Sequence, residues 1–186
     1  MKAAGISGSL SGPPLYHETQ RFHQTWLWVL VGGVAALTWW VFVRQVVQGQ
    51  EFGNNPSPDW GLWLLLLFIG IGLPGLFLYL RLVLEVTPEQ IVIRFRPFHT
   101  RVIPLSEVRE FEVRHYSAVK EYGGWGIKGW SRAKVAYNVS GNEGVELTLE
   151  DGRRVMLGSQ RASELAQAIG MAQGHTSGAA EYAVEE

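Results

Sequence analysis

Two long apolar runs and a later stretch of alternating apolar and polar residues divide this chain. The first run, Thr25 to Phe42 (TWLWVLVGGVAALTWWVF), contains 18 residues without a formal charge, and the second begins at Trp60 (WGLWLLLLFIGIGLPGLFLYL) and ends before Arg81. About 20 apolar residues in a helix span roughly 30 Å of hydrocarbon. We therefore predict a transmembrane hairpin within residues 25–84, with helices at about 25–47 and 60–84.

The segments around the hairpin are polar. Residues 1–24 contain Gly, Ser and a Pro13-Pro14 pair without an apolar period, which predicts a flexible polar leader. A cleaved signal peptide is the competing interpretation. The first run begins too far from Met1 for a signal peptide, is too long and lacks a small-residue cleavage site. We therefore expect the first helix to remain attached.

Basic residues lie mainly on one side of the predicted hairpin, and only Arg44 lies toward the connecting loop. By the positive-inside rule, this distribution places both termini in the cytoplasm and the hairpin in the inner (plasma) membrane. The residues on the cytoplasmic side are Lys2, Arg21, Arg81, Arg94, Arg96 and Arg101.

The two predicted spans contain no ionisable residue at mid-depth, which disfavours a transporter. Gly32 and Ala36 form a small-xxx-small pair that allows close helix contact, either within the hairpin or between subunits, and the former is simpler. Pro74 is expected to kink the second helix unless the neighbouring helix supplies backbone partners.

Residues 85–172 show a two-residue alternation that predicts antiparallel strands. Asp151-Gly152, between two alternating runs, predicts a hairpin. A helical stripe from about Arg161 to Ala172 follows, and residues 173–186 are predicted to be a disordered acidic tail. The predicted strands lie near 90–95, 100–104, 109–115, 134–139, 145–150 and 155–157.

The segments VTPEQIVIRF, PFHTRVIPLSEV, GGWGIKGW, AYNVSGNEGVELTLEDGR and GSQRASELAQAI lie between Val86 and Ile169, directly after the hairpin. In this arrangement the chain resembles the bacterial pleckstrin-homology-like (PH-like) membrane proteins. The resemblance implies a membrane α+β fold. Its domain, residues 85–172, would be a bent antiparallel sheet or barrel of about seven strands, capped by the C-terminal helix. The patterns above give about six strands, so one strand is either missing or hidden in the loop after Tyr116. The resemblance implies no catalytic residues.

Composition excludes several classes of function. Within residues 85–172, 12 Lys and Arg balance 11 Asp and Glu, so a nucleic-acid partner is not expected. The chain has no cysteine, which removes disulfides, thiolate nucleophiles and thiolate metal sites. The five histidines have no metal-ligand spacing. We expect no cofactor, no metal and no catalytic residue.

The loop after Tyr116 holds the candidate contact residues: Trp125, Lys128, Trp130, Arg132 and Lys134. Indole rings beside cationic side chains suit a lipid headgroup surface. The alternative is that the Trp rings fold onto the core of the domain and that the glycines form turns. A partner-binding role for the loop stays open.

These patterns, together with the resemblance, predict a non-enzymatic integral membrane protein. Its PH-like domain would lie at the cytoplasmic face of the lipid bilayer and bind a protein partner or a second copy of itself. The alternative function is an anionic-lipid-binding module that acts through the loop from Trp125 to Lys134.

Overall fold

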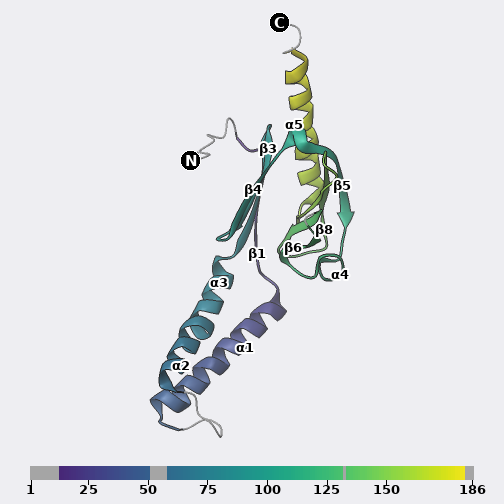
Figure 1. The fold of residues 1–186 in the computed structure, drawn as a ribbon. Coiled ribbons are helices and arrows are strands. Elements are labelled where there is room, and N and C mark those ends of the chain that lie inside the picture. The colour runs from purple at the N-terminus through teal and green to yellow at the C-terminus, as the bar shows by residue number, and fades with distance from the viewer. Residues whose placement is uncertain (1–12, 51–57, 132, 183–186) are drawn as a thin grey trace. The chain divides into compact units, whose positions relative to one another are not determined.

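The computed structural model describes residues 13–50, 58–131 and 133–182, and its elements are labelled in Figure 1. The chain divides into two compact units. One unit is Arg21–Arg81, and the other joins the residues up to Gln20 with those from Leu82 onward. The helical hairpin is therefore an insertion between two pieces of chain that fold together.

The hairpin consists of two apolar helical segments. The first is α1 (Thr25–Phe42) continued by the π-helical η1 (Val43–Val47), and the second is α2 (Asp59–Leu65), the π-helical η2 (Leu66–Gly72) and α3 (Leu73–Tyr79). Both are long and apolar enough to cross a membrane, at 23 and 21 residues. The prediction for the first helix is confirmed in its bounds. The second helix ends at Tyr79 rather than at residue 84, because the next residues pair as a strand.

A narrow stripe of α1 faces its partner helix. Val31, Ala35, Thr38 and Phe42 are buried, and Phe42 packs with Leu62 and Leu66 of the returning helix. Gly32 and Ala36 are exposed, so of the two contacts left open for this small pair, the one within the hairpin is not formed among the described residues. Large apolar side chains cover the outside of the hairpin, among them Val29, Leu30, Leu37, Leu67, Phe68 and Leu78.

The proline in the second helix is compensated by the first helix. Pro74 has no N–H, so the Gly70 carbonyl lacks its usual donor four residues later. Trp39 Nε1 donates a hydrogen bond of 3.3 Å to this carbonyl. The absence of a side chain at Gly70 allows the indole to approach, since a Cβ there would lie 3.3 Å from Trp39 Nε1. The neighbouring helix thus supplies a backbone partner, as the sequence required.

The described residues of the second unit form two sheets. The first has the order β1-β2-β3-β4, and the second has the order β5-β8-β9-β7-β6. The strands of the first sheet are β1 (Tyr16–Arg21), β2 (Arg81–Val86), β3 (Gln90–Arg96) and β4 (His99–Pro104). Those of the second are β5 (Val108–His115), β6 (Gly126–Ser131), β7 (Lys134–Asn138), β8 (Glu143–Leu149) and β9 (Arg154–Gly158), with the 3₁₀ turn η3 (Leu105–Glu107) before β5 and the helix α4 (Ala118–Tyr122) after it.

The architecture is α+β as predicted, with two corrections to the sheet. β7 and β9 are parallel, so the second sheet is mixed rather than antiparallel. The two sheets are separate in their pairing, and they do not close into a barrel. Of the two alternatives for the additional strand, the structure has the hidden one, because the loop after Tyr116 contains β6 together with the short helix α4. The predicted hairpin at Asp151-Gly152 is confirmed, with Gly152 at φ 81° between the antiparallel β8 and β9.

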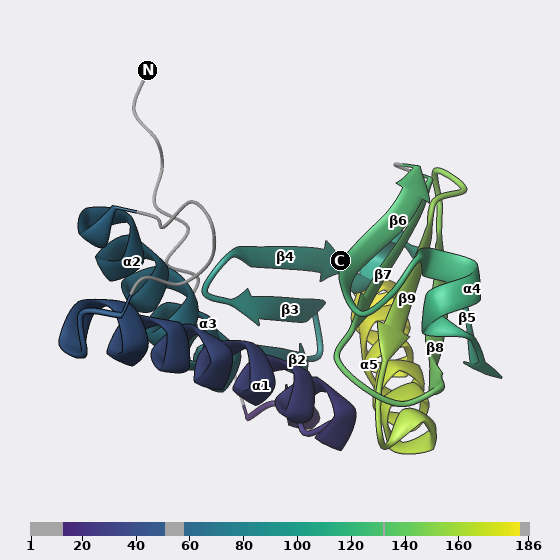
Figure 2. The same ribbon diagram turned by 90° about the horizontal axis from the view of Figure 1, so that it is seen from below.

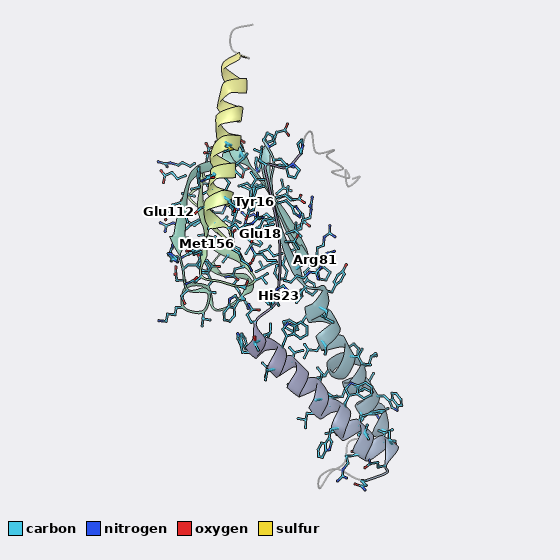
Figure 3. All side chains as sticks on the ribbon, turned by 180° about the vertical axis from the view of Figure 1, so that it is seen from behind. Tyr16, Glu18, His23, Arg81, Glu112 and Met156 are labelled. Atoms are coloured by element: carbon cyan, nitrogen blue, oxygen red, sulfur yellow. The ribbon has the colours of Figure 1, made fainter. Side chains whose placement is uncertain are left out.

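The segment before the hairpin is not a flexible leader throughout. Tyr16–Arg21 forms the edge strand β1, whose alternate side chains are buried. Glu18 Oε2 accepts hydrogen bonds from Tyr16 Oη (2.6 Å) and Ser159 Oγ (2.7 Å), and Gln20 Nε2 donates to the Gly158 carbonyl. Figure 3 labels Tyr16 and Glu18 among the side chains of the domain. Because two of its three inward residues are polar, β1 has no apolar period to reveal it.

The C-terminal helix α5 (Ala162–Tyr182) packs on β5, β8 and η3. The predicted stripe is confirmed, because Leu165, Ala168, Ile169 and Ala172 are all buried. The helix continues ten residues beyond Ala172, so the predicted tail is wrong for residues 173–182. Residues 183–186 lie outside the described part. Gln173 Nε2 donates a 2.8 Å hydrogen bond to the Val108 carbonyl, which ties this extension to β5.

Candidate functional site

The second sheet has one face on the side of α5 and an opposite face, here called the outer face. Directly opposed residues on neighbouring strands point to the same face. Glu112, Glu146, Met156 and Ala136 form one such row across β5, β8, β9 and β7. One half of the outer face is covered, because Tyr116, Ala118 and Tyr122 pack with Ala136 and Met156.

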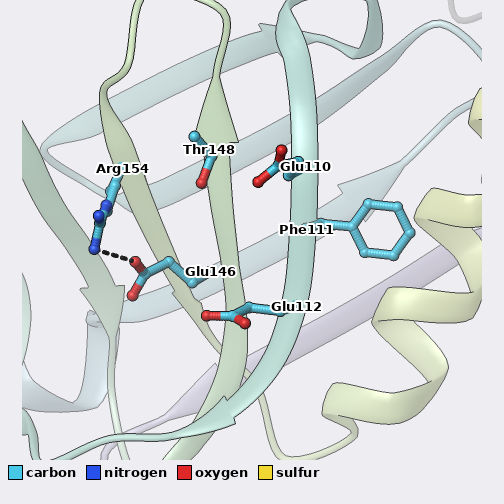
Figure 4. A pocket seen from close by; sticks show the side chains of 6 residues that line it. All are labelled: Glu110, Phe111, Glu112, Glu146, Thr148 and Arg154. Carbon is cyan, nitrogen blue, oxygen red and sulfur yellow. Dashed lines mark ion pairs between the residues drawn. The ribbon is translucent and has the colours of Figure 1, made fainter.

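The other half of the outer face is open and contains a polar pocket of about 400 Å³. Figure 4 shows the side chains of Glu110, Glu112, Glu146, Thr148 and Arg154 on one side of the sheet, whereas Phe111 points the other way, toward a helix. This pocket gathers three carboxylates, one hydroxyl and one guanidinium from three strands. We call it the β5 pocket.

A buried ion pair forms the floor of the β5 pocket. The side chain of Glu146 is only 4% exposed, and it pairs with Arg114 Nη1 and, at 3.5 Å, with Arg154 Nη1. A buried carboxylate needs such partners to offset its lost hydration. Burial by itself lowers the pKa of Arg114, but the hydrogen bond and charge of Glu146 and the charge of Glu121 raise it overall. Arg114 therefore stays charged.

Arg114 also connects the ion pair with Glu146 to charged residues on the covered half of the outer face. Arg114 Nη2 lies 2.7 Å from Glu121 Oε2 and Lys134 Nζ lies 3.7 Å from the same oxygen. The backbone N–H of Ser117 also donates to Glu121 (2.9 Å). This hydrogen bond, together with the charges of Arg114 and Lys134, lowers the pKa of Glu121. Burial, followed by the charge of Glu146, raises the pKa of Tyr122 to about 12.

Two carboxylates of the β5 pocket are open to a ligand. Glu110 lies 3.7 Å from Arg109 in a pair whose side chains are about 70% exposed, and such exposed pairs contribute little. Glu112 is exposed. On β5 it lies directly opposite Glu146 of β8. Among the described residues, none forms an ion pair with Glu112. These two side chains can accept hydrogen bonds from a cationic group.

The pocket also lies beside the edge of the sheet. β5 is an outermost strand, and within the described sheet it pairs only with β8. An edge strand can accept an added strand through its backbone groups. A ligand at this site would therefore meet both a strand edge and two carboxylates.

The predicted contact loop has a different environment. Trp125 is half-buried and packs on the cluster of Tyr116, Tyr122 and Met156, and Lys134 lies over the Tyr122 ring at 4.8 Å. Lys128 is exposed on β6, opposite Ala136. The backbone of Trp130 belongs to β6, but its side chain and all of Arg132 lie outside the described part.

Sequence reasoning missed the groups that build the β5 pocket. Glu146 and Thr148 alternate with Val145, Leu147 and Leu149, which is also the pattern of a strand with one solvated face. The pairing of Glu146 with Arg114 joins residues 32 positions apart, and no local signal reveals it. The described residues contain no group of three His, Cys, Asp or Glu side chains that could hold a metal ion.

The hairpin unit has a smaller hollow of about 230 Å³, lined by Arg21, Phe22, His23, Trp28, Phe77 and Leu78. Two contacts hold its walls together. The rings of Phe22 and Phe77 meet edge to face at 5.7 Å, and Trp28 Nε1 donates to the Phe22 carbonyl. The hollow therefore lies where the first and last turns of the helical pair come together.

The chain belongs to a family of unknown function (DUF6141), whose profile matches residues 11–175. This match includes β1, the hairpin, both sheets and most of α5. No curated protein matches the chain.

Proposed function

We propose that this member of the DUF6141 family is a non-enzymatic integral membrane protein whose hairpin holds a PH-like domain at the cytoplasmic face of the inner membrane. Two apolar helices of 23 and 21 residues support the anchor. The excess of Lys and Arg outside the connecting loop supports the orientation. Two sheets followed by a C-terminal helix are compatible with a PH-like domain.

The domain, in this proposal, binds a protein partner through the β5 pocket. The observation that carries the proposal is the combination of an open strand edge with two exposed carboxylates, Glu110 and Glu112. The partner that fits is an extended segment with Lys or Arg side chains. Its backbone would add to β5, and its cationic groups would meet the two carboxylates.

A second copy of the chain fits this surface less well. A two-fold interface brings the same patch of both copies together. When two copies of β5 pair antiparallel about Phe111, Glu110 of one copy faces Glu112 of the other, and like charges that face each other across strands are destabilising. A cationic partner avoids this repulsion.

The loop from Trp125 to Lys134 has no lipid-binding role in this proposal. Lys134 is engaged by Glu121, and the Trp125 ring packs against buried residues. An anionic-lipid site needs cations and aromatic rings that reach the headgroups. Among the candidate contact residues whose side chains are described, Trp125, Lys128 and Lys134, only Lys128 is exposed.

The partner proposal can be tested in cells with a photo-cross-linking amino acid at position 112 of the full chain, and a control at the exposed Lys120 of α4. We expect a discrete heteromeric product from position 112 only. Mass spectrometry should find Lys or Arg in the linked peptide. Glu110→Lys should abolish the product, and the matched Glu107→Lys should leave it. A product of two copies of this chain, or none above the control, would contradict the proposal.

The orientation has a separate test. A reporter enzyme that is active only in the periplasm is fused after Glu186, and the same reporter is inserted in the connecting loop after Gln50. We expect activity from the loop insertion and none from the C-terminal fusion. The opposite pattern would overturn the cytoplasmic placement of the domain.

A further inference from the structure

The β3–β4 hairpin is a basic element with an aromatic tip. Residues 90–104 contain three arginines and His99 but no acidic residue. At the turn, Phe98 is 65% exposed and Arg96 is exposed as well. Arg94 is paired with Glu85 at 2.6 Å. Among the described residues, no ion-pair partner is found for Arg96, so the tip presents a cation beside an exposed ring.

The connectivity places this tip at the end of the first sheet where the chain leaves the apolar helix. Thr87 N–H donates to the Gln90 carbonyl across the short connection between β2 and β3, so these strands run in opposite directions (Figure 2). The tip after β3 therefore lies at the end of the sheet where β2 begins. Since α3 ends at Tyr79 and β2 begins at Arg81, only Leu80 separates that end from the helix.

The hairpin is held by contacts behind its tip. The ring of His99 stacks on that of Tyr137, with centroids 6.1 Å apart and planes at 10°. The Arg101 guanidinium lies 6.0 Å from the centre of the same ring. These contacts join β4 to β7 of the second sheet. The tip is thus a fixed projection rather than a loose loop.

We infer that the tip of the β3–β4 hairpin, residues 96–98, contacts the anionic lipid headgroups of the membrane that holds the helices. The Phe98 ring would enter the interfacial region, and Arg96 would meet lipid phosphates. An exposed aromatic ring beside a cation is the arrangement that membrane interfaces favour. This inference rests on the proposed membrane insertion of the hairpin.

The chain has no cysteine, so a single introduced cysteine carries a unique nitroxide label. We would label Phe98→Cys in the full chain, in nanodiscs of phosphatidylglycerol and phosphatidylcholine and in discs of phosphatidylcholine alone. Label depth follows from power saturation with oxygen and a water-soluble nickel chelate. Two further single-cysteine variants serve as controls for the label at position 98. Phe68→Cys replaces a phenylalanine of equal exposure in the helix, and Glu89→Cys replaces an exposed residue at the other end of β3.

We expect headgroup depth at position 98 in the anionic discs, hydrocarbon depth at position 68 and full water access at position 89. Arg96→Gln should move the label at position 98 toward water. We expect a severalfold increase in its accessibility to the nickel chelate. Water access at position 98 with hydrocarbon depth at position 68 would overturn this inference alone. Water access at position 68 would overturn the membrane proposal itself. Equal depth in both disc types, unaffected by Arg96→Gln, would overturn the anionic-lipid contact.

Discussion

Ser159 Oγ donates a 2.7 Å hydrogen bond to Glu18 Oε2, although the two residues are 141 positions apart. Both side chains are buried. The second carboxylate oxygen of Glu18 accepts from the Gln160 backbone N–H at 3.0 Å, just before α5 begins. The strand that precedes the helical hairpin is thereby tied to the start of the C-terminal helix. The same carboxylate raises the pKa of Tyr16, in addition to the larger effect of burial.

Glu18→Ala should strongly destabilise the domain. Three donors, on Tyr16, Ser159 and Gln160, would lose their acceptor, at a cost of about 2–4 kcal/mol. This corresponds to a melting temperature lower by roughly 5–15 °C for a chain of this size. Thermal unfolding of the full chain in detergent measures it. Thr19→Ala, at the exposed neighbouring position, should change little, and equal melting of both variants would contradict the assigned role of Glu18.

Two glycines should respond to alanine with opposite signs. A Cβ at Gly158 would lie 2.5 Å from Tyr116 Oη and 2.7 Å from Asn138 Cβ, so Gly158→Ala should cost about 1–3 kcal/mol through overpacking. Gly170 lies within α5, where a Cβ would meet Phe111 at an ordinary 3.5 Å. Gly170→Ala should therefore stabilise the helix by about 0.5–1 kcal/mol. Unfolding midpoints of both variants, compared with the natural chain, test the pair.

Glu121 should make the stability of the domain depend on pH. Its pKa is lowered in the folded state by the Ser117 N–H and by the nearby cations. Its ionised form therefore adds stability above its unfolded pKa, about 4.5, and that stability is lost as the pH falls through the lower folded value. Glu121→Gln should destabilise the protein at pH 7. The difference from the natural chain should shrink below about pH 4.5. A difference independent of pH, or one equal to that of the exposed control Lys120→Gln, would argue against this ion-pair role.

Trp39 and Pro74 should be energetically coupled. Trp39→Phe removes the donor to the Gly70 carbonyl, and we expect a loss of about 1 kcal/mol in hairpin stability. In a Pro74→Ala background the restored N–H can donate to Gly70, so the same substitution should cost less. Unfolding of the four variants by titration with a denaturing detergent gives the coupling energy. Trp40→Phe is the matched control. If Trp40 and Trp39 showed equal coupling energies with Pro74, the hydrogen bond to the Gly70 carbonyl would not be the source of the coupling.

The elements encoded by long apolar runs or by strict alternation were predicted most accurately from the sequence. The bounds of the first helix, the hairpin at Asp151-Gly152 and the buried stripe of α5 follow from local patterns that side-chain period controls directly. The same rules did not find β1, because its inward residues are Tyr16, Glu18 and Gln20. They extended the second helix too far, because Leu82, Val83 and Leu84 are as apolar as the span before them. Pairing with neighbouring strands decides their conformation.

The candidate site shows the same division. The loop with Trp125 and Lys134 attracted attention because unusual residue types stand close together in the sequence. Arg114 and Glu146 did not attract attention, because each stands in a stretch whose mixture of apolar and charged residues is that of an ordinary strand with one solvated face. Only the β5–β8 register brings these two side chains together, and only burial of Glu146 makes their pairing necessary.

By itself, the sequence determined two apolar helices, a strand-rich domain after them and a C-terminal amphipathic helix, because hydrophobic period and turn chemistry are local properties. The tertiary structure alone decided that the hairpin is inserted between β1 and β2, that β7 lies parallel to β9, and that a buried ion pair forms the floor of an acidic pocket. These features depend on contacts between distant residues. Polar groups such as Glu18 and Glu146 can be buried only where those contacts provide hydrogen-bond partners.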